Sequence, residues 1–432
     1  MAWKVLLAGL LVREGFSFWT GSPYDLEVWI RTGNAVAQGL NPYAFWPPVP
    51  GVSIAYLTTT LPSAAYLPFW PLLTGSLYRL WEGTGGGDRF ALYFLLKQPP
   101  IVGDVVTAYL LYQIAMRWTG RAPTALAALT FWSFFPYAII MTAIWGQFDS
   151  IVVAMILAAF LVREPLARHT LYGWGIFVKW ITAIYLPLEA FAVRGWRRAG
   201  VLLALAIPAA ATLAVFLGLG WSFQNVIAAS TSQTHGGGGG MNWVGILTSG
   251  PVNPTVESLP YVDTVLSYLW VPAILIAGWV GARWFAAGRP YGMLRAMILV
   301  TTVFLLFRWG LYEQYLLYLF PLLFLDVLAF HPARRRLFGW TSVLAYAYLL
   351  ANNDLGIRFL APLSPSVADF TEGLDASAGY GFVRTYVLIA LCGLVTVTLV
   401  QLALAYYRDE SAPIPWWHLL RPAPVLTAPP GS

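Results

Sequence analysis

Long apolar runs alternate with short polar stretches along almost the whole chain. About twelve runs are long enough to suggest passage through a bilayer. The pattern predicts an all-α polytopic membrane protein, because a helix satisfies its backbone polar groups within one segment. The runs cover residues 2–20, 62–82, 91–116, 123–143, 150–163, 171–193, 199–219, 263–282, 296–311, 314–330, 337–351 and 383–407.

Basic residues gather at one set of segment ends, and the positive-inside rule places such ends in the cytoplasm. External stretches are then predicted at 21–90, 145–150, 220–262, 308–313 and 352–382. The basic residues that mark the predicted cytoplasmic ends are Lys4, Arg117, Arg121, Arg163, Arg168, Arg194, Arg197, Arg198, Arg283, Arg289, Arg295, Arg334, Arg335, Arg336 and Arg408.

Two runs cannot be simple crossings if this assignment holds. The run at 62–82 is predicted to be a lateral helix in the outer interface, broken by Pro68 and Pro71, with Trp and Tyr at headgroup level. The run at 171–193 begins and ends beside basic loops, so we expect two short helices that meet near Lys179 at the outer face. About twelve membrane segments then remain, and both termini face the cytoplasm.

The predicted organisation has four parts. Residues 1–220 form a membrane module that includes the first external loop, residues 21–90. Residues 221–262 form a second external loop, in which five consecutive glycines at 236–240 are typical of a hinge. Residues 263–407 form a C-terminal membrane module, and residues 408–432 form a proline-rich cytoplasmic tail.

Composition agrees with a membrane location. Hydrophobic residues make up 59% of the chain and charged residues 10%, against about 25% charged in soluble domains. The net charge of +6 reflects topology rather than nucleic-acid binding, since the basic residues lie at segment ends. The 30 prolines and 39 glycines indicate broken helices around a cavity. The sequence has no GxxxxGK[ST] loop, His/Cys metal spacing or Ser-His-Asp arrangement, which weighs against ATP-driven transport and soluble-type hydrolysis.

The first charged group lies in the stretch "SPYDLEVWIR" after the first apolar run. Asp25, Glu27 and Arg31 belong to one helix start, capped by Ser22 or Asp25 itself. The structural alternative is that the acids only complement the helix dipole.

Two further groups lie at the edges of apolar runs. Gln147 and Asp149 begin the helix expected near residue 150, where Asp149 could serve only as the N-cap. Lys97 and Asp104 are seven residues apart and share a helical face, so an ion pair between them is the structural alternative. Lys179 has no partner nearby in sequence, which favours a functional role.

The last group lies at a predicted external helix junction, in the stretch "FRWGLYEQYLL". It contains Arg308, Tyr312, Glu313, Gln314 and Tyr315, for which interfacial anchoring is the alternative. His235 is interpreted as a loop residue. Together the groups favour an anionic, lipid-linked substrate, because Arg and Lys suit a phosphate headgroup and a carboxylate suits deprotonation of a hydroxyl.

The first loop resembles the GT-C glycosyltransferases that use polyprenyl-phosphate sugars. "DLEVW" followed by "GLNPY" is similar to their Asp-x-Asp loop, with Glu27 in the second acidic position. "WGQFDS" resembles the short acidic turn after their third membrane helix, and "YEQYLLYLFPL" resembles a Gln-Tyr-rich helix start. The resemblance covers about residues 15–330 and is strongest to the first mannosyltransferase of GPI-anchor assembly and its prokaryotic relatives.

The resemblance implies a GT-C-like bundle of about twelve membrane helices with amphipathic helices in the first external loop. It implies an inverting transfer of a hexose, with mannose expected, from polyprenyl or dolichyl phosphate to a hydroxyl of a lipid or protein acceptor. The active site would lie outside a plasma membrane. A divalent cation is left open, because Glu27 replaces the family's second Asp.

The implied roles follow from these positions. Asp25 would be the base and Glu27 would orient it or the sugar. The expected phosphate partners are Arg308, Lys97 and Lys179, and Asp149 and Gln147 would hold sugar hydroxyls or the acceptor. The remaining candidates for substrate binding are Arg31, Glu313, Gln314 and Tyr315.

Two functions from other classes stay open on the sequence alone. A secondary transporter or lipid flippase would also have many segments, broken helices and membrane-embedded charges. An inactive scaffold subunit of a glycosylation complex would keep the fold without the chemistry.

Overall fold

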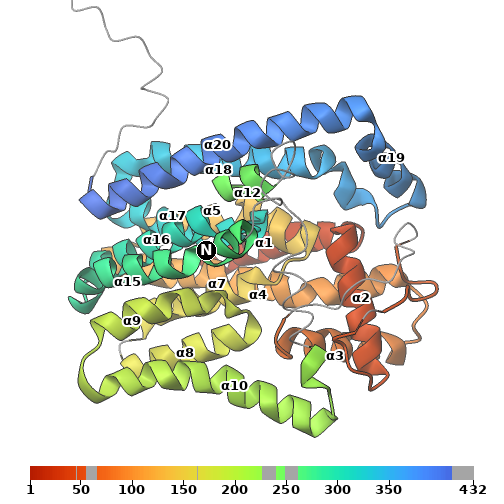
Figure 1. Ribbon diagram of the computed structural model, residues 1–432, viewed down its shortest axis with the longest axis horizontal. Coiled ribbons are helices and arrows are strands. Elements are labelled where there is room, and N and C mark those ends of the chain that lie inside the picture. Colours follow the sequence, from red (N-terminus) through yellow and green to blue (C-terminus); the bar gives the residue numbers. More distant parts are fainter. Residues whose placement is uncertain (45, 55–65, 163, 226–239, 249–260, 411–432) are drawn as a thin grey trace, which may run out of the picture.

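The computed structural model describes residues 1–44, 46–54, 66–162, 164–225, 240–248 and 261–410. Within these ranges the regular secondary structure consists of helices, as the apolar pattern predicts. Many of the long helices lie side by side along the horizontal direction of Figure 1, whereas α2 crosses at the right-hand end. The predicted hinge glycines 236–239, His235 and the tail 411–432 lie outside the described residues.

The N-terminal half contains α-helices joined by short 3₁₀ and π segments. Their bounds are α1 Ala2–Ser17, α2 Pro23–Ala37, α3 Phe69–Gly83, α4 Arg89–Thr119, α5 Ala122–Ser133, α6 Pro136–Ile139, η1 Ile140–Trp145, α7 Asp149–Leu161, α8 Pro165–Val178, η2 Trp180–Tyr185, α9 Leu186–Ala192, η3 Gly195–Arg198 and α10 Ala199–Leu219.

The C-terminal half has the same character and ends with a long helix. Its elements are α12 Trp243–Thr248, α14 Val262–Tyr268, α15 Trp270–Ala286, α16 Pro290–Phe307, η5 Glu313–Tyr318, α17 Phe320–Ala329, η6 Pro332–Arg334, α18 Arg335–Asn352, η7 Asp354–Leu360, α19 Pro365–Ala376 and α20 Ala378–Arg408.

Four helices in the described part of the chain are long and apolar enough to cross a membrane. They are Ala199–Leu219, Thr264–Ala286, Pro290–Phe307 and Ala378–Arg408, and the bent pair Ala122–Ser133 and Pro136–Trp145 would make a fifth. The expected number of about twelve is therefore not confirmed. Several apolar runs instead form shorter helices, such as Asp149–Leu161 and Trp180–Ala192.

The stretch 21–90, predicted to be the first external loop, contains the two helices α2 and α3. Ser22 caps α2, because its hydroxyl accepts a hydrogen bond from the Asp25 amide and Pro23 occupies the first helical position. Helix α3 follows Pro68 and buries Trp70, Tyr78 and other residues on one side. The two helices pack together, and the predicted lateral helix thus begins at Phe69 rather than at residue 62, within the part described.

The run at 171–193 is broken at Lys179, as expected. Lys179 has extended backbone angles, φ −156° and ψ 127°, between α8 and η2. A charged side chain within an apolar run needs a partner or a function, because burying its charge is costly. The break therefore places a charged side chain between two short helices.

The stretches predicted to be external meet at one end of the molecule. The Gly21 amide donates to the Phe359 carbonyl over 2.9 Å, and the Asn352 side chain donates to Glu313 over 2.7 Å. Helices α2 and α19 both lie at the right-hand end in Figure 1. These contacts join segments that are distant in sequence.

The stretches predicted to be cytoplasmic also contact one another. Arg117 donates to the Leu161 carbonyl over 2.8 Å, and Arg295 donates to the Tyr406 carbonyl over 2.7 Å. Arg334 donates to the Glu410 carbonyl over 2.8 Å. The fold thus separates the two predicted sets of ends.

The proposed ion pair between Lys97 and Asp104 is wrong. Asp104 is buried and pairs with Arg13 over 2.6 Å, and it also accepts hydrogen bonds from Trp132 and Thr142. The Lys97 ammonium donates to the carbonyl and hydroxyl oxygens of Thr20 instead. Arg13 comes from α1, so the true partner lies on another helix and not on the same face of α4.

Candidate functional site

Asp25 lies in the first turn of α2 with a partly exposed side chain. Its Oδ2 atom accepts hydrogen bonds from the Trp145 indole over 2.5 Å and from the Gln147 amide over 2.9 Å. Ser22 donates its amide to the Trp145 carbonyl, which ties the two segments together. The Asp25 carboxylate is therefore held in place while its side chain keeps exposed surface.

The turn that carries Trp145 and Gln147 depends on a glycine. Gly146 has φ +95°, a backbone conformation that side chains with a Cβ rarely adopt. A Cβ at this position would also lie within 3.2 Å of Trp29 and 3.3 Å of the Lys97 side chain. The turn therefore brings the two hydrogen-bond donors to Asp25, Trp145 and Gln147, close to the Lys97 side chain.

The surroundings of Asp25 raise the pKa of its carboxyl group. Desolvation raises the pKa of Asp25 above its ordinary value, while the hydrogen bond from Trp145 and the Lys179 charge oppose the rise. The neighbouring Asp149 carboxylate raises the pKa of Asp25 further. A carboxylate with a raised pKa is a stronger base than an ordinary aspartate.

Asp149 and Lys179 form a buried ion pair. The Lys179 ammonium lies 2.8 and 2.9 Å from the two Asp149 oxygens, and the Tyr318 hydroxyl donates to Asp149 over 2.5 Å. Asp149 is the first residue of α7 and Phe148 is its N-cap, so the interpretation of Asp149 as a cap is wrong. Lys179 thus has a partner thirty residues away in sequence.

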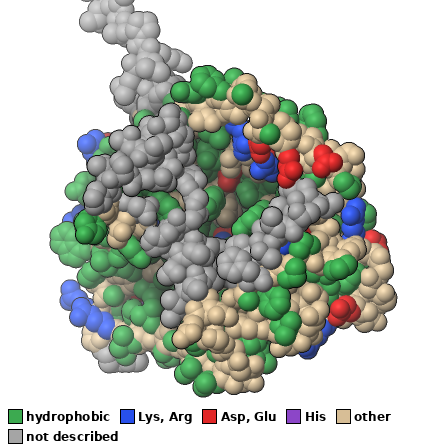
Figure 2. Space-filling model, turned by 45° about the vertical axis from the view of Figure 1, so that its right-hand side comes forward, with side chains coloured by type: hydrophobic (Ala, Val, Ile, Leu, Met, Phe, Trp, Pro, Cys, Tyr) green, Lys and Arg blue, Asp and Glu red, His purple; other side chains and the backbone are tan. Residues whose placement is uncertain are grey.

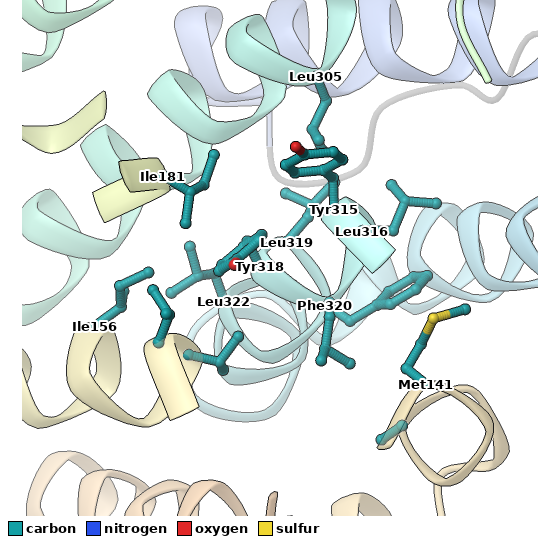
Figure 3. Packing of buried hydrophobic residues seen from close by; sticks show 14 of the residues in the cluster. Met141, Ile156, Ile181, Leu305, Tyr315, Leu316, Tyr318, Leu319, Phe320 and Leu322 are labelled. Carbon is teal, nitrogen blue, oxygen red and sulfur yellow. The ribbon is translucent and has the colours of Figure 1, made fainter. Parts of the chain in front are cut away.

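Aromatic rings surround the Lys179 ammonium. Its nitrogen lies 5.4 Å from the ring centre of Tyr66, 5.2 Å from that of Phe148 and 5.3 Å from that of Tyr315. In Figure 3, Tyr315 and Tyr318 lie near Ile181 of η2. Rings at these distances stabilise the ammonium, which is 2% exposed.

Arg308 lies directly after α16 and has no ion pair with a carboxylate in the described part of the chain. Its buried Nε atom has no hydrogen-bond partner there, and its guanidinium lies 5.1 Å from the ring centre of Trp180 and 5.7 Å from that of Trp270. A guanidinium held only by aromatic faces can bind an added anion.

Tyr312 lies between Arg308 and Glu313 in the chain. Burial raises the pKa of the Tyr312 phenol, the Asp25 charge adds to the rise and the Arg308 charge opposes it. Tyr312 itself is 42% exposed. Figure 2 turns this end of the molecule forward and shows it hollowed, with acidic and basic side chains around the hollow.

The predicted Glu313 and Gln314 are both buried at the start of η5. Glu313 accepts hydrogen bonds from Asn352 and Asn353. The Gln314 Oε1 atom and the Gln147 Oε1 atom are buried without a partner among the residues that the structure describes. Two such acceptors can bind hydroxyl groups of a ligand.

Glu27 and Arg31 lie apart from this cluster. Glu27 is fully buried and pairs with Arg31 over 2.6 Å. Its carboxylate also accepts hydrogen bonds from the Ser53 hydroxyl and, over 2.9 Å, from the Ile54 amide. Both oxygens of Glu27 therefore accept hydrogen bonds from the loop that follows α2.

This geometry does not fit a metal held jointly by Asp25 and Glu27. Both Glu27 oxygens already accept hydrogen bonds, and residues two apart on a helix face different sides. Within the described ranges, no three His, Cys, Asp or Glu side chains are grouped as metal ligands.

Lys97 is fully buried and reaches the same turn from α4. Its ammonium contacts only Thr20 among the hydrogen-bond partners in the described ranges. Its side chain packs beside Gly146. Lys97 is thus close to the Asp25 turn but enclosed by protein.

Sequence reasoning did not select Trp145, Tyr66 or Tyr318 as site residues. Trp145 begins the quoted stretch "WGQFDS", so an indole next to a glycine turn was an available signal. Tyr318 also stands inside a quoted stretch, "YEQYLLYLFPL", but its contact with Asp149 comes from a distant segment. Tyr66 had no such signal, because its contact with Lys179 also comes from a distant segment.

Comparison with models of known protein families gives no match to the chain, and comparison with curated protein sequences gives none either.

Proposed function

We propose that the chain is a membrane glycosyltransferase that moves a hexose, with mannose expected, from a polyprenyl or dolichyl phosphate to an acceptor hydroxyl. The proposal includes a GT-C-like bundle of about twelve membrane segments in the plasma membrane, with the active site on the outer face. The observation that carries it is the partly exposed Asp25, whose carboxylate accepts hydrogen bonds from Trp145 and Gln147.

In the proposed reaction the acceptor oxygen attacks the sugar carbon that bears the phosphate. Asp25 takes the hydroxyl proton as the new carbon–oxygen bond forms, and the bond to the phosphate oxygen breaks with inversion. The polyprenyl phosphate leaves with the bonding electron pair. Raised basicity of Asp25 favours the proton transfer.

Arg308 is proposed to hold the departing phosphate. Its Nε atom has no hydrogen-bond partner among the described residues, whereas the Lys179 charge is balanced by Asp149. Lys179, Asp149 and Lys97 would then act mainly by shaping the field and the walls of the site. The free acceptor atoms of Gln147 and Gln314 suit sugar hydroxyls.

The direct test is a transfer assay with purified protein, radiolabelled polyprenyl-phosphate mannose and an extract of membrane lipids or peptides. Asp25→Asn should abolish transfer of the label while leaving folding intact. The matched control is Glu82→Gln, which changes an exposed acid in the same external loop. A fully active Asp25→Asn protein would remove Asp25 as the base.

A secondary transporter or flippase is the second candidate, because one observation favours it. The break at Lys179 places a buried ion pair between two short helices, an arrangement that transporters use at their substrate sites. Vesicles that contain the protein would then move the lipid-linked sugar across the bilayer with its phosphate bond intact. Cleavage of that bond decides for the transferase.

A further inference from the structure

A cavity lies at the end of the molecule that the basic residues mark as cytoplasmic. It has a volume of about 570 Å³ and is lined by parts of α8, α9, α15 and α16. That volume lies in the range typical of small-molecule sites. Its lining includes Arg168, Arg194, Val193, Phe285, Gly288 and Met293.

Arg168 is fixed at the wall of this cavity. Its Nε and Nη2 atoms donate to the two oxygens of Glu189, and its guanidinium lies 5.1 Å from the ring centre of Phe285. Glu189 is fully buried and does not line the cavity. The arrangement leaves Arg168 Nη1 without a partner among the described residues, at a fixed position.

Arg194 supplies charge that no carboxylate balances. It is exposed, it lines the same cavity, and no ion pair joins it to an acid in the described ranges. The apolar atoms of Val193, Phe285 and Met293 lie along the same lining. The cavity thus combines two guanidinium groups with an apolar wall.

We propose that this cavity binds a phosphate group with net negative charge, separate from the Asp25 site. Guanidinium groups form charge-assisted hydrogen bonds with phosphate oxygens. A fixed Arg168 lowers the conformational cost of binding. The phosphate can come from an anionic lipid, whose glycerol or chain would contact the apolar wall, or from free phosphate.

The test measures lipid affinity of the purified full-length protein in uncharged detergent. Dioleoyl phosphatidylglycerol, dioleoyl phosphatidylcholine and inorganic phosphate are titrated separately, and the dissociation constant is taken from the shift in melting temperature. Arg194→Ala is compared with Arg336→Ala, an exposed arginine at the same predicted side that does not line the cavity.

Phosphatidylglycerol should stabilise the wild type and Arg336→Ala, and its affinity for Arg194→Ala should fall about tenfold. Arg194→Lys should restore part of the loss. Competition by inorganic phosphate would identify a general phosphate site, and its absence would identify a lipid headgroup site. Equal affinities of the two alanine variants, or equal binding of phosphatidylcholine, would overturn the proposal.

This inference does not depend on the transferase reaction. Loss of label transfer in Asp25→Asn and loss of lipid binding in Arg194→Ala are separate readouts. Either can fail while the other stands.

Discussion

Asp25 and Glu27 have opposite surroundings although they are two residues apart. Asp25 contacts the turn at Trp145 and keeps exposed surface, while Glu27 is enclosed with Arg31 and the loop at Ser53. In a helix, residues two apart point about 200° away from each other, and residues four apart share a face. The spacing therefore predicts the Glu27–Arg31 pair, once α2 is known to be helical through this stretch.

The hydrogen bond from Trp145 gives a prediction about pH. That bond lowers the pKa of Asp25, so Trp145→Phe should raise it further. A base must be deprotonated to act, and the acidic limb of kcat/KM should therefore move to higher pH in the variant. At acidic pH the variant should be about tenfold slower, and above the limb the two rates should converge.

The measurement is a pH profile of label transfer for wild type and Trp145→Phe. Trp279→Phe serves as the control, because Trp279 is 68% exposed and lies on α15 away from Asp25. A uniform loss of rate at every pH would mean that Trp145 acts only through packing.

Glu27 gives the opposite prediction, a loss of stability. Glu27→Gln removes the charge of the carboxylate that pairs with the buried Arg31, which should cost about 3 kcal/mol. The melting temperature in detergent should fall well below that of Glu82→Gln. An unchanged melting temperature together with loss of transfer would show that Glu27 acts in the transfer reaction and not in stability.

At the scale of elements, local signals predicted where helices begin and break. Ser22 and Pro23 mark the start of α2, and Lys179 marks the break after α8. Partners between distant segments were not predictable, because an apolar helix shows in sequence which residues are polar but not which neighbour they face. Lys179 with Asp149 is such a case.

The same limitation explains the wrong pairing of Asp104. A seven-residue spacing places Lys97 and Asp104 on one helical face, but Pro99 and Pro100 lie between them and α1 packs beside α4. Asp104 therefore pairs with Arg13 of α1 and not with Lys97.

The contact between α4 and α7 gives a prediction for a glycine. A Cβ at Gly103 would lie 2.8 Å from the Ile151 backbone nitrogen and 3.0 Å from its Cα. Backbone atoms cannot yield as a flexible side chain can, so Gly103→Ala should separate the helices and lower the melting temperature, with a cost of about 1–3 kcal/mol.

Gly15→Ala is the matched control, because nothing lies within 4 Å of a Cβ at that position of α1. It should be neutral or stabilise slightly, since alanine favours helices. Equal melting temperatures for the two variants would show that α4 and α7 do not approach as closely as described.

At the scale of the whole molecule, the basic residues predicted which segment ends belong together. The contacts of Gly21 with Phe359 and of Arg295 with Tyr406 join the expected sets at separate ends. The number of full-length spans was less predictable. Hydropathy measures how apolar a run is, but prolines and buried charges divide several runs into short helices.

Helix α20 gives a test of orientation, because it runs from one set of ends to the other. It has 31 residues, or about 46 Å of helix, which exceeds a hydrocarbon core of about 30 Å. Exposed Ser377 precedes it and exposed Arg408 ends it. The positive-inside rule places Arg408 in the cytoplasm, together with Arg334.

Single cysteines at these positions report the side directly. In intact cells, a membrane-impermeant maleimide should label Ser377→Cys and leave Arg408→Cys unlabelled until the membrane is opened. The native Cys392 is 4% exposed, so the unchanged protein should give little background. Asn352, at the Ser377 end, contacts Glu313, and Gly21, just before α2, contacts Phe359. Labelling of Ser377→Cys from outside would therefore place the Asp25 site on the outer face. Labelling of Arg408→Cys alone would show that the orientation is the reverse of the predicted one. It would then rule out a transferase with its active site on the outer face.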